Sequence, residues 1–376
     1  MDWEAHARRL AGEVTRVESR WYGPLATTPR HEFVPRWWER EGSRWRQHVG
    51  ASDPERWMSR VYSDRTLVTR VGNEHAEGAF PGAVAYEGMP TSSSTLPSLV
   101  VSMYRHAMIG DNSRVLVTTG TGYGTALLCR RLGDHLVASV DVDPNLVRLA
   151  SERLDRIGLH PRLVVCNITG ALPEQYDRIV STVSVRPVPR TWLTALRSGG
   201  RLVTTIAGTG LVLTADKTPD GGAVGRIELD PASFMQTRHG DDYEYPTEKV
   251  HTAAVEQEGD EVETDRYPLL YPPDSWAVRS MLALAVPGID YRQEEIDGVR
   301  TVWLLHADGS WARATATEFL GSPVVHQGGP QRLWRELQRI RNRLNREGEL
   351  PAHGAKVTIT PDGETTLSRG SWSQTL

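Results

Sequence analysis

RVLVTTGTGYGTALL at residues 114–128 and SVDVDP at residues 139–144 together decide the fold of this chain. The β-branched run Val115–Val117 predicts a strand, which enters a turn with glycine at positions 120, 122 and 124. Glycine lets a ligand approach the backbone where a strand turns into a helix, and an acid about twenty residues further on can hold two ribose hydroxyls. Asp141, which ends the next apolar run, has that spacing. The pattern therefore predicts a nucleotide-cofactor cradle.

The spacing of the glycines distinguishes two cofactor classes that use this geometry. The dinucleotide fingerprint GxGxxG requires glycine at position 125, where this chain has Thr125. The pattern therefore favours S-adenosylmethionine over NAD. A tight structural turn with a solvated Asp141 is the alternative without a cofactor, and the strand–turn–helix–strand order argues against it.

The composition limits the class of protein. The 376 residues, 39% of them hydrophobic, suffice for more than one core, so we expect two domains. A formal net charge of -4 argues against a nucleic-acid-binding protein, which normally carries a basic excess. We find no apolar segment of signal-peptide length at the start and no run that could cross a bilayer. We therefore expect a cytoplasmic protein without a nucleic-acid or membrane partner.

Cysteine and histidine usage predicts neither a disulfide framework nor a metal site. Cys129 and Cys166 are the two cysteines, and both stand in apolar surroundings that favour reduced thiols. The histidines lack HExxH or other ligand spacing, and no G-x-S-x-G nucleophile turn occurs. We therefore expect no metal and no hydrolase chemistry.

Strand and helix patterns alternate between residues 114 and 206, which predicts βαβ units, a mostly parallel sheet and an α/β fold. The expected strands are 115–119, 137–140, 163–166, 177–181 and 201–206, and the expected helices are 125–131, 145–158 and 191–197. Two further strands, 210–216 and 223–229, flank a turn and would complete the sheet with an antiparallel edge.

The style of the sequence changes after Phe234. An acidic patch and Tyr-Pro-rich turns are followed by a short strand at 301–306 and a charged helix at 331–346. This mixture predicts a separate C-terminal α+β domain. We expect it to be an accessory domain that recognises the substrate. The expected division is a cofactor-binding domain at 1–240 and the accessory domain at 241–376.

Three segments upstream of the glycine turn carry a resemblance to a known family. They are PRHEFVP at 29–35, YSDRTL at 62–67 and TLPSLVVSM at 95–103. In this order they resemble the protein L-isoaspartate O-methyltransferase family, over about residues 25–240. The resemblance implies a class I Rossmann-like S-adenosylmethionine methyltransferase that methylates a carboxylate. It implies cofactor contacts at Thr118, Thr119, Gly120, Gly122, Tyr123, Asp141, Val142, Asn167 and Ile168.

Two downstream segments narrow the resemblance. IVSTVSVRPVP at 179–189 and GGRLVTTIAGTGL at 199–211 look like a bacterial subgroup with an additional C-terminal domain. That subgroup is associated with ribosomally synthesised peptides, either graspetides or lanthipeptides. The resemblance implies methylation of an aspartate side chain in a modified precursor peptide. Attack of the following backbone amide on the ester then gives an aspartimide, which can hydrolyse to isoaspartate.

Three positions of the cofactor region depart from the family pattern. Leu116 and Thr118 stand where the family has an acid and a glycine. Asn167 stands where an aspartate usually contacts the adenine amino group, and its amide oxygen can accept the same hydrogen bond. A strand-end turn is the alternative role for Asn167.

The expected catalytic residues are Ser94, Thr95 and Asp64. Thr95 aligns with the serine of the family's Ser-Gln-Pro segment near the substrate carboxylate, although the glutamine is replaced by Leu96. Hydroxyls can fix a carboxylate without neutralising it. Helix capping is the alternative for Thr95 and is compatible with substrate contact. Asp64 would orient a loop or accept from a peptide backbone, and a surface turn is its alternative.

The expected substrate-binding residues are Ser93, Arg186 and His326. Arg186 follows a strand at the carboxyl edge of the sheet, where α/β proteins bind ligands, and a structural ion pair is its alternative role. His326 lies in SPVVHQGGP at 322–330, which is either a turn between domains or a loop that grips the peptide.

Four functions remain open from the sequence. Methylation of an aspartate in a precursor peptide leads, and repair of L-isoaspartyl residues in proteins is the second enzymatic reading. A cofactor-binding scaffold without catalysis is the non-enzymatic reading, suggested by Leu116 and Thr118. A dehydrogenase is the most distant alternative.

Overall fold

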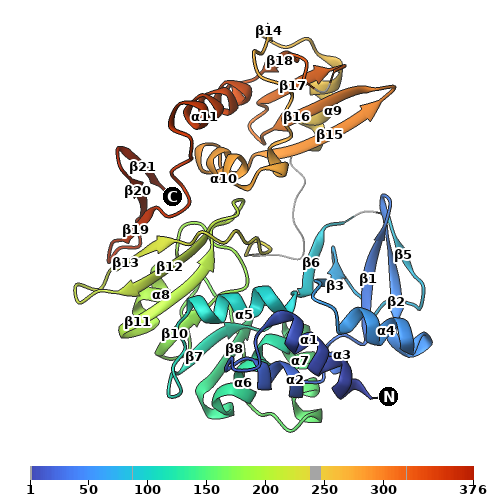
Figure 1. Cartoon of the computed structure of the whole chain (residues 1–376), viewed down its shortest axis with the longest axis vertical. Coiled ribbons are helices and arrows are strands. Elements are labelled where there is room, and N and C mark those ends of the chain that lie inside the picture. The colour runs from blue at the N-terminus through green and yellow to red at the C-terminus, as the bar shows by residue number, and fades with distance from the viewer. Residues whose placement is uncertain (1, 87, 238–246, 319) are drawn as a thin grey trace.

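The computed structural model describes residues 2–86, 88–237, 247–318 and 320–376. Within them the chain forms three sheets (Figure 1), of ten, six and five strands. The ten-stranded sheet and its helices confirm the predicted α/β class.

The ten-stranded sheet has the order β21-β20-β19-β13-β12-β11-β10-β7-β8-β9. Five consecutive parallel strands form one side: β7 (Val115–Thr118), β8 (Val137–Asp141), β9 (Arg162–Val165), β10 (Tyr176–Val180) and β11 (Leu196–Thr205). The accompanying helices are α5 (Pro97–His106), α6 (Tyr123–Leu132), α7 (Pro144–Arg156) and α8 (Arg190–Ala195). These elements overlap the strands and helices predicted from residues 114–206.

Local chemistry explains why helices follow β7 and β8 directly. Gly122 begins α6 in the left-handed region, at φ 91°, which a residue with a side chain rarely adopts. A Cβ there would also lie 3.1 Å from Cβ of Ala150, so the turn packs against α7. Asp143 caps α7 by accepting from the backbone N–H of Asn145, and Pro144 takes the first helical position.

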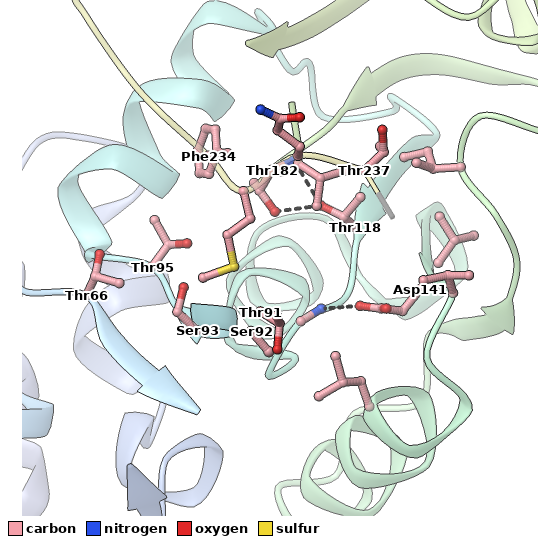
Figure 2. Close-up of a pocket in the computed structure, with 18 of the residues that line it drawn as sticks. Thr66, Thr91, Ser92, Ser93, Thr95, Thr118, Asp141, Thr182, Phe234 and Thr237 are labelled. Atoms are coloured by element: carbon pink, nitrogen blue, oxygen red, sulfur yellow. Dashed lines mark hydrogen bonds between the residues drawn. The ribbon is translucent and has the colours of Figure 1, made fainter. Parts of the chain in front are cut away.

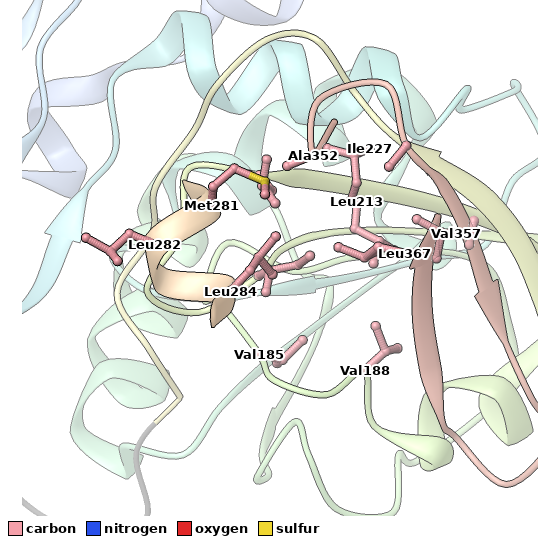
Figure 3. Packing of buried hydrophobic residues seen from close by; sticks show 14 of the residues in the cluster. Val185, Val188, Leu213, Ile227, Met281, Leu282, Leu284, Ala352, Val357 and Leu367 are labelled. Atoms are coloured by element: carbon pink, nitrogen blue, oxygen red, sulfur yellow. The ribbon is translucent and has the colours of Figure 1, made fainter. Parts of the chain in front are cut away.

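The antiparallel strands β12 (Val212–Lys217) and β13 (Ala223–Ile227) follow β11 as predicted, but they are not the edge of the sheet. The C-terminal strands β19 (Lys356–Ile359), β20 (Thr365–Arg369) and β21 (Trp372–Thr375) extend the sheet beyond β13. Burial drives this pairing, because Val357 and Leu367 pack in the same core as Leu213 (Figure 3). A Cβ on Gly225 of β13 would lie 1.8 Å from the carbonyl oxygen of Thr214, so glycine permits the close strand packing.

This pairing differs from the expected division of the chain into 1–240 and 241–376. Residues 356–375 are strands of the same sheet as residues 115–227. The expected boundary between 240 and 241 itself lies outside the described residues.

The rest of the C-terminal segment forms an antiparallel sheet of order β14-β18-β17-β16-β15. Its strands are β14 (Glu261–Thr264), β15 (Asp290–Ile296), β16 (Val299–Leu305), β17 (Trp311–Ala316) and β18 (Val324–Gly328). The helices are α9 (Glu248–Glu256), α10 (Trp276–Ala285) and α11 (Leu333–Glu347). The predicted strand 301–306 and helix 331–346 correspond to β16 and α11.

The N-terminal region forms a six-stranded sheet that the sequence did not predict. Its strands are β1 (Arg36–Glu41), β2 (Arg44–Val49), β3 (Leu67–Val71), β4 (Glu74–His75), β5 (Val84–Ala85) and β6 (Pro90–Ser94). The helices are α1 (Trp3–Val14), α2 (Tyr22–Thr27), α3 (Arg30–Phe33) and α4 (Pro54–Val61). Neighbouring Trp37 and Trp38 enter different hydrophobic clusters, as the alternation of side chains along β1 requires.

Ion pairs hold the N-terminal sheet against α7. Glu77 pairs with the buried Arg153, which also donates to the carbonyl of Thr121 in the glycine turn. His75 lies 3.1 Å from the Asp143 carboxylate through Nε2. Segments far apart in the sequence therefore meet beside the turn between β7 and α6.

Candidate active site

A cavity of about 220 Å³ opens at the carboxyl ends of β7 and β8. Ligands bind at this edge in open α/β sheets. Figure 2 shows hydroxyl side chains, including Ser93 and Thr95, across the cavity from Asp141. We call the side with Asp141 the cofactor wall and the side with Ser93 and Thr95 the acceptor wall.

The cofactor wall is built on the Asp141 carboxylate. Its Oδ2 accepts from the N–H of Gly120 at 3.0 Å, and its Oδ1 accepts from the N–H of Asp143 at 3.1 Å. A carboxylate at the end of the second strand is the kind of group that holds ribose hydroxyls in this fold. Val142 and Ile168 add apolar surface beside it. The carboxylate and the apolar surface beside it fit the ribose and the adenine ring of S-adenosylmethionine. When bound, this cofactor would supply a methyl group on a sulfonium.

Asn167 lines the cavity, but its amide oxygen is already used. That oxygen accepts from the backbone N–H of Thr169 at 2.9 Å and from its hydroxyl at 2.8 Å. Both lone pairs are therefore engaged in the turn after β9. The geometry favours the turn role over the expected adenine contact through this oxygen.

Leu116 and Thr118, the departures from the family pattern, are accommodated without strain on the site. Leu116 is fully buried in the main core and does not line the cavity. Thr118 lines the cavity, and its hydroxyl lies 2.5 Å from that of Thr182 and accepts from the N–H of Thr182 at 2.9 Å (Figure 2). Thr118 therefore ties the end of β7 to the segment that follows β10.

The other residues expected at the cofactor lie behind the wall. Thr119 bonds through its hydroxyl to that of Ser139, at 2.7 Å. Thr119 and Tyr123 line a second, smaller cavity of about 30 Å³ behind the turn. Gly122 lines neither cavity, and it serves as the first residue of the helix turn.

The acceptor wall follows the end of β6. Ser93 and Thr95 line the main cavity, together with Thr66, Thr91 and Ser92. Ser94 lies between them but lines only the smaller cavity, and its hydroxyl accepts from Arg30 at 3.4 Å. The expected pair Ser94 and Thr95 is therefore divided, with Ser93 and Thr95 open to the main cavity.

Arg30 organises the acceptor wall, which the sequence analysis did not predict. Its guanidinium is completely buried and makes six hydrogen bonds, one to the Ser94 hydroxyl and five to the carbonyls of Val61, Ser63, Arg65, Ser94 and Thr95. Burial lowers the pKa of this group from its ordinary value. Arg30 lies in PRHEFVP, so the recognised segment contained the signal, but its role requires contacts with distant loops.

Asp64 acts as a cap and does not line the main cavity. Its carboxylate accepts from the N–H of Ser98 at 2.9 Å, in the first turn of α5. This contact fixes the start of α5 directly after Thr95. The loop-orienting role expected for Asp64 agrees with this contact.

Arg186 and His326 lie outside the cavity lining, in contrast to the expected substrate contacts. The Arg186 guanidinium donates to the carbonyls of Ala283, at 2.8 Å, and Leu284, at 3.2 Å, at the end of α10. Helix C-termini attract cations in this way, so Arg186 joins the segment after β10 to α10. His326 lies on β18 and its Nδ1 is 2.9 Å from the carbonyl of Glu258.

The segment 322–330 is a strand with a capping turn. Its β18 lies in the five-stranded sheet, and the Gln327 side chain accepts from the N–H of Trp334 at 2.9 Å in the first turn of α11. The Trp334 indole donates to Asp265 at 2.7 Å. Neither of the two roles expected for this segment describes these contacts.

Residues 233–237 form the roof of the cavity, and no motif in the sequence predicted this role. Phe234 and Thr237 lie above the hydroxyl groups in Figure 2, and Met235 also lines the cavity. The N–H of Ser184 donates to the carbonyl of Met235 at 2.8 Å, which fixes the roof to the segment after β10. Leu96 and Leu99 complete an apolar rim.

The charge at the cavity is restricted to one sign. Asp141 is its charged lining residue, and no lysine, arginine or histidine lines it among the described residues. Among the described lining residues, hydroxyl and backbone groups are the ones that could hold a bound carboxylate. Such groups orient the anion without an ion pair that lowers its nucleophilicity.

The described residues contain no group of three or more histidine, cysteine or acidic side chains placed to hold a metal ion. Neither Cys129 nor Cys166 forms a disulfide. Among the helices that the structure describes, none has the length and apolar character needed to cross a bilayer.

Part of the chain is similar in sequence to known protein-L-isoaspartate O-methyltransferases. The model of the family "Protein-L-isoaspartate(D-aspartate) O-methyltransferase (PCMT)" matches residues 72–230. A protein-L-isoaspartate O-methyltransferase of Thermotoga maritima is 35% identical over 129 residues, which cover 33% of this chain and 41% of the relative. Protein-L-isoaspartate O-methyltransferase 1 of Archaeoglobus fulgidus is 27% identical over 209 residues, which cover 54% of this chain and 78% of the relative.

A solved structure titled protein-L-isoaspartate O-methyltransferase matches 100% of this chain and 99% of its own, with a TM-score of 0.51 and 20% identity. This likeness confirms the Rossmann-like methyltransferase fold. Its coverage includes the C-terminal segment of this chain. The family model matches residues 72–230 and the Thermotoga relative is matched over less than half of its length, so the chain is similar to the protein-L-isoaspartate O-methyltransferase family over this region.

Proposed function

We propose that this protein is an S-adenosylmethionine-dependent O-methyltransferase that acts on a carboxylate of a peptide or protein. The observation that carries the proposal is the single cavity with Asp141 and Gly120 on one wall and the hydroxyls of Ser93 and Thr95 on the other. The Thermotoga relative is covered over only 41% of its length, so its activity supports the proposal without deciding it.

The chain's own residues have a limited chemical task in this reaction. An aspartate carboxylate is ionised at neutral pH, so no general base is needed. The hydroxyls of Ser93 and Thr95 hold the carboxylate and orient one oxygen towards the methyl donor on the cofactor wall. Phe234, Met235 and Leu96 exclude water from the mouth. Orientation of this kind can supply several kcal/mol of the barrier reduction.

We infer that the preferred acceptor is an aspartate side chain in a ribosomally synthesised, modified precursor peptide, of the graspetide or lanthipeptide class. The subgroup resemblance at 179–211 motivates this choice, and Leu96 in place of glutamine makes the rim apolar. The product would be the methyl ester. It closes to an aspartimide when the nitrogen of the following backbone amide attacks the ester carbonyl and methanol leaves with the amide proton. The expected setting is cytoplasmic, where a precursor peptide is made.

Repair of L-isoaspartyl residues in proteins is the second candidate, and the names of the relatives favour it. The C-terminal segment does not separate the two candidates. A solved protein of this name matches the full length of this chain, so an extended C-terminal part is compatible with a repair enzyme.

Mass spectrometry separates these functions. The protein is incubated with S-adenosylmethionine and, separately, with a cyclised aspartate-containing precursor peptide, its linear form and a linear isoaspartyl peptide. Methyl gain on the cyclised peptide alone supports the precursor-peptide proposal, and gain on the isoaspartyl peptide alone supports repair. Absence of methyl gain on every peptide, together with binding of S-adenosylhomocysteine, would support a scaffold without catalysis.

A further inference from the structure

A further cleft of the described structure lies away from the candidate active site. It has a volume of about 700 Å³ and lies between α10, α11 and the C-terminal strand β21 (Figure 1). Volumes of this order are typical of ligand-binding clefts. We call it the arginine cleft, because four of its lining residues are Arg335, Arg339, Arg343 and Arg346.

The charge of the arginine cleft has one sign. No aspartate or glutamate lines it among the described residues. Helix α11, which forms one side, carries five arginines and two glutamates. The side chains of Arg339 and Arg346 are 71% and 76% exposed. The cleft therefore presents cations to solvent.

Each of the four arginines pairs with a glutamate. These ion pairs do not use all the N–H donors of the guanidinium groups. Arg335 pairs with Glu261 at 2.7 Å, Arg339 pairs with Glu336, and Arg343 and Arg346 share Glu347 at 2.7 and 2.8 Å. A guanidinium has five N–H donors, so each group can bind a further carboxylate. Exposed pairs of this kind are weak and can exchange partners.

The base of the arginine cleft is apolar. Met281 and Leu284 of α10 and Ile340 of α11 line it, and Trp372 of β21 lies at its edge. The same Met281 and Leu284 belong to the main hydrophobic core, which also contains Val185 and Val188 (Figure 3). A ligand suited to this surface needs apolar side chains as well as negative charge.

The arginine cleft is connected to the candidate active site through the segment after β10. Thr182 and Val183 of this segment line the active-site cavity. Three residues further on, Arg186 holds the carbonyls at the end of α10, which forms one side of the cleft. One short segment therefore contacts both sites.

We propose that the arginine cleft binds an acidic peptide segment with interspersed apolar residues. This segment would be a part of the substrate distant from the acceptor residue, which lies in the active site. The positive lining matches the acidic side chains, and the apolar base matches the others. A single-stranded nucleic acid is a poorer match, because its bases stack on several aromatic side chains, and Trp372 is the one aromatic residue that lines the cleft among the described residues. The docking is independent of methyl transfer, so it can be tested without cofactor.

Fluorescence anisotropy of the full chain tests the proposal. The probe is a short fluorescein-labelled peptide of alternating glutamate and leucine, and the comparison peptide has glutamine in place of glutamate. We expect the glutamate peptide to bind more tightly, with affinity that falls as salt rises. The double variant R339E/R346E should weaken its binding about tenfold, because attraction is replaced by repulsion at two positions.

The matched control is Arg8→Glu, since Arg8 is an exposed helical arginine with an i,i+4 glutamate partner on α1. It changes the charge of the protein without touching the arginine cleft, and its binding should equal that of the wild type. If circular dichroism shows that the double variant is unfolded, R339Q/R346Q replaces it, with a smaller loss expected. Equal binding of the glutamine peptide, or of a single-stranded DNA oligonucleotide, would overturn the proposal, as would equal loss in the Arg8 variant.

Discussion

The two walls of the active-site cavity are assembled in different ways. The core of the cofactor wall comes from one continuous stretch, because Gly120 lies in the turn after β7, Asp141 ends the neighbouring strand β8, and α6 joins the two. The acceptor wall combines β6 and the loop before α5 with residues 233–237, and the buried Arg30 holds part of it together. The comparison indicates that cofactor binding is a local property of the sheet, whereas acceptor binding depends on contacts between distant segments.

The largest effect is expected from breaking the support of the acceptor wall with Arg30→Lys. A lysine retains the charge but has three donors and cannot reach the same set of carbonyls, which leaves buried acceptors unpaired. We expect the free energy of unfolding to fall by about 3 kcal/mol, because buried charged networks lose this much when one partner is removed. Urea denaturation followed by circular dichroism measures it.

The surface substitution Arg40→Lys is the control for that measurement, since Arg40 donates only to the nearby carbonyl of Gly42. It should change stability by much less than Arg30→Lys. Equal stability of Arg30→Lys and the wild type would contradict the supporting role of Arg30.

Breaking the cofactor wall with Asp141→Ala should weaken binding of S-adenosylhomocysteine about a hundredfold. Hydrogen bonds to a charged group contribute about 1.5–3 kcal/mol each, and the carboxylate would accept from two ribose hydroxyls. Isothermal titration calorimetry measures the affinity. Asp155→Ala is the control, because Asp155 is an exposed acid of α7 that pairs with His160. It should leave the affinity unchanged. A loss below about threefold in Asp141→Ala would contradict the assignment.

Thr95→Val sharpens the comparison, because it removes one hydroxyl of the acceptor wall and retains the shape of the side chain. We expect methyl transfer to fall about tenfold, as the loss of one hydrogen bond predicts, while the affinity for S-adenosylhomocysteine stays the same. Thr95→Ser retains the hydroxyl and should retain most of the activity. A parallel loss of cofactor affinity in Thr95→Val would show that the walls are not separable.

The smallest effect concerns Asp143, which joins the N-terminal sheet to α7. The hydrogen bond with His75 lowers the pKa of this carboxyl from 3.8 to about 2, and Arg70 contributes further. The ionised form therefore stabilises the fold above about pH 4, and this contribution is lost as the pH falls towards 2. Asp143→Asn, which can still cap α7, should lower the stability at neutral pH by about 1 kcal/mol.

The difference in unfolding free energy between Asp143→Asn and the wild type should shrink between about pH 4 and pH 2, as measured by urea denaturation at several pH values. A difference that is constant over this range would mean that the charge of Asp143 does not contribute.

The sequence predicted the strand, the glycine turn and the strand-end acid of the cofactor wall because their signals are local. The run Val115–Val117, the glycine turn and Asp141 fix a strand, a helix start and a strand end within a short span. Leu116 departs from the family pattern, yet it is buried in the main hydrophobic core, where an apolar residue is favoured. Asn167 was harder to interpret, because the partner of its amide oxygen is decided by the turn at Thr169.

The acceptor wall and the far strands could not be predicted in the same way. The burial pattern of β19 alternates as in any half-buried strand, and nothing in it specifies β13 as the partner. Residues 233–237 carry no periodic signal, and their place over the cavity depends on contacts with Ser184. Likewise, Arg186 was expected at the substrate because it follows a strand end, whereas the neighbouring α10 offers it two carbonyls.

Calorimetric titration of the wild-type chain with S-adenosylhomocysteine tests the central claim most directly. We predict saturable binding at one site, weakened about a hundredfold in Asp141→Ala and retained in Thr95→Val, with no heat on addition of NADH. Absence of binding by S-adenosylhomocysteine, or binding that survives unchanged in Asp141→Ala, would contradict it.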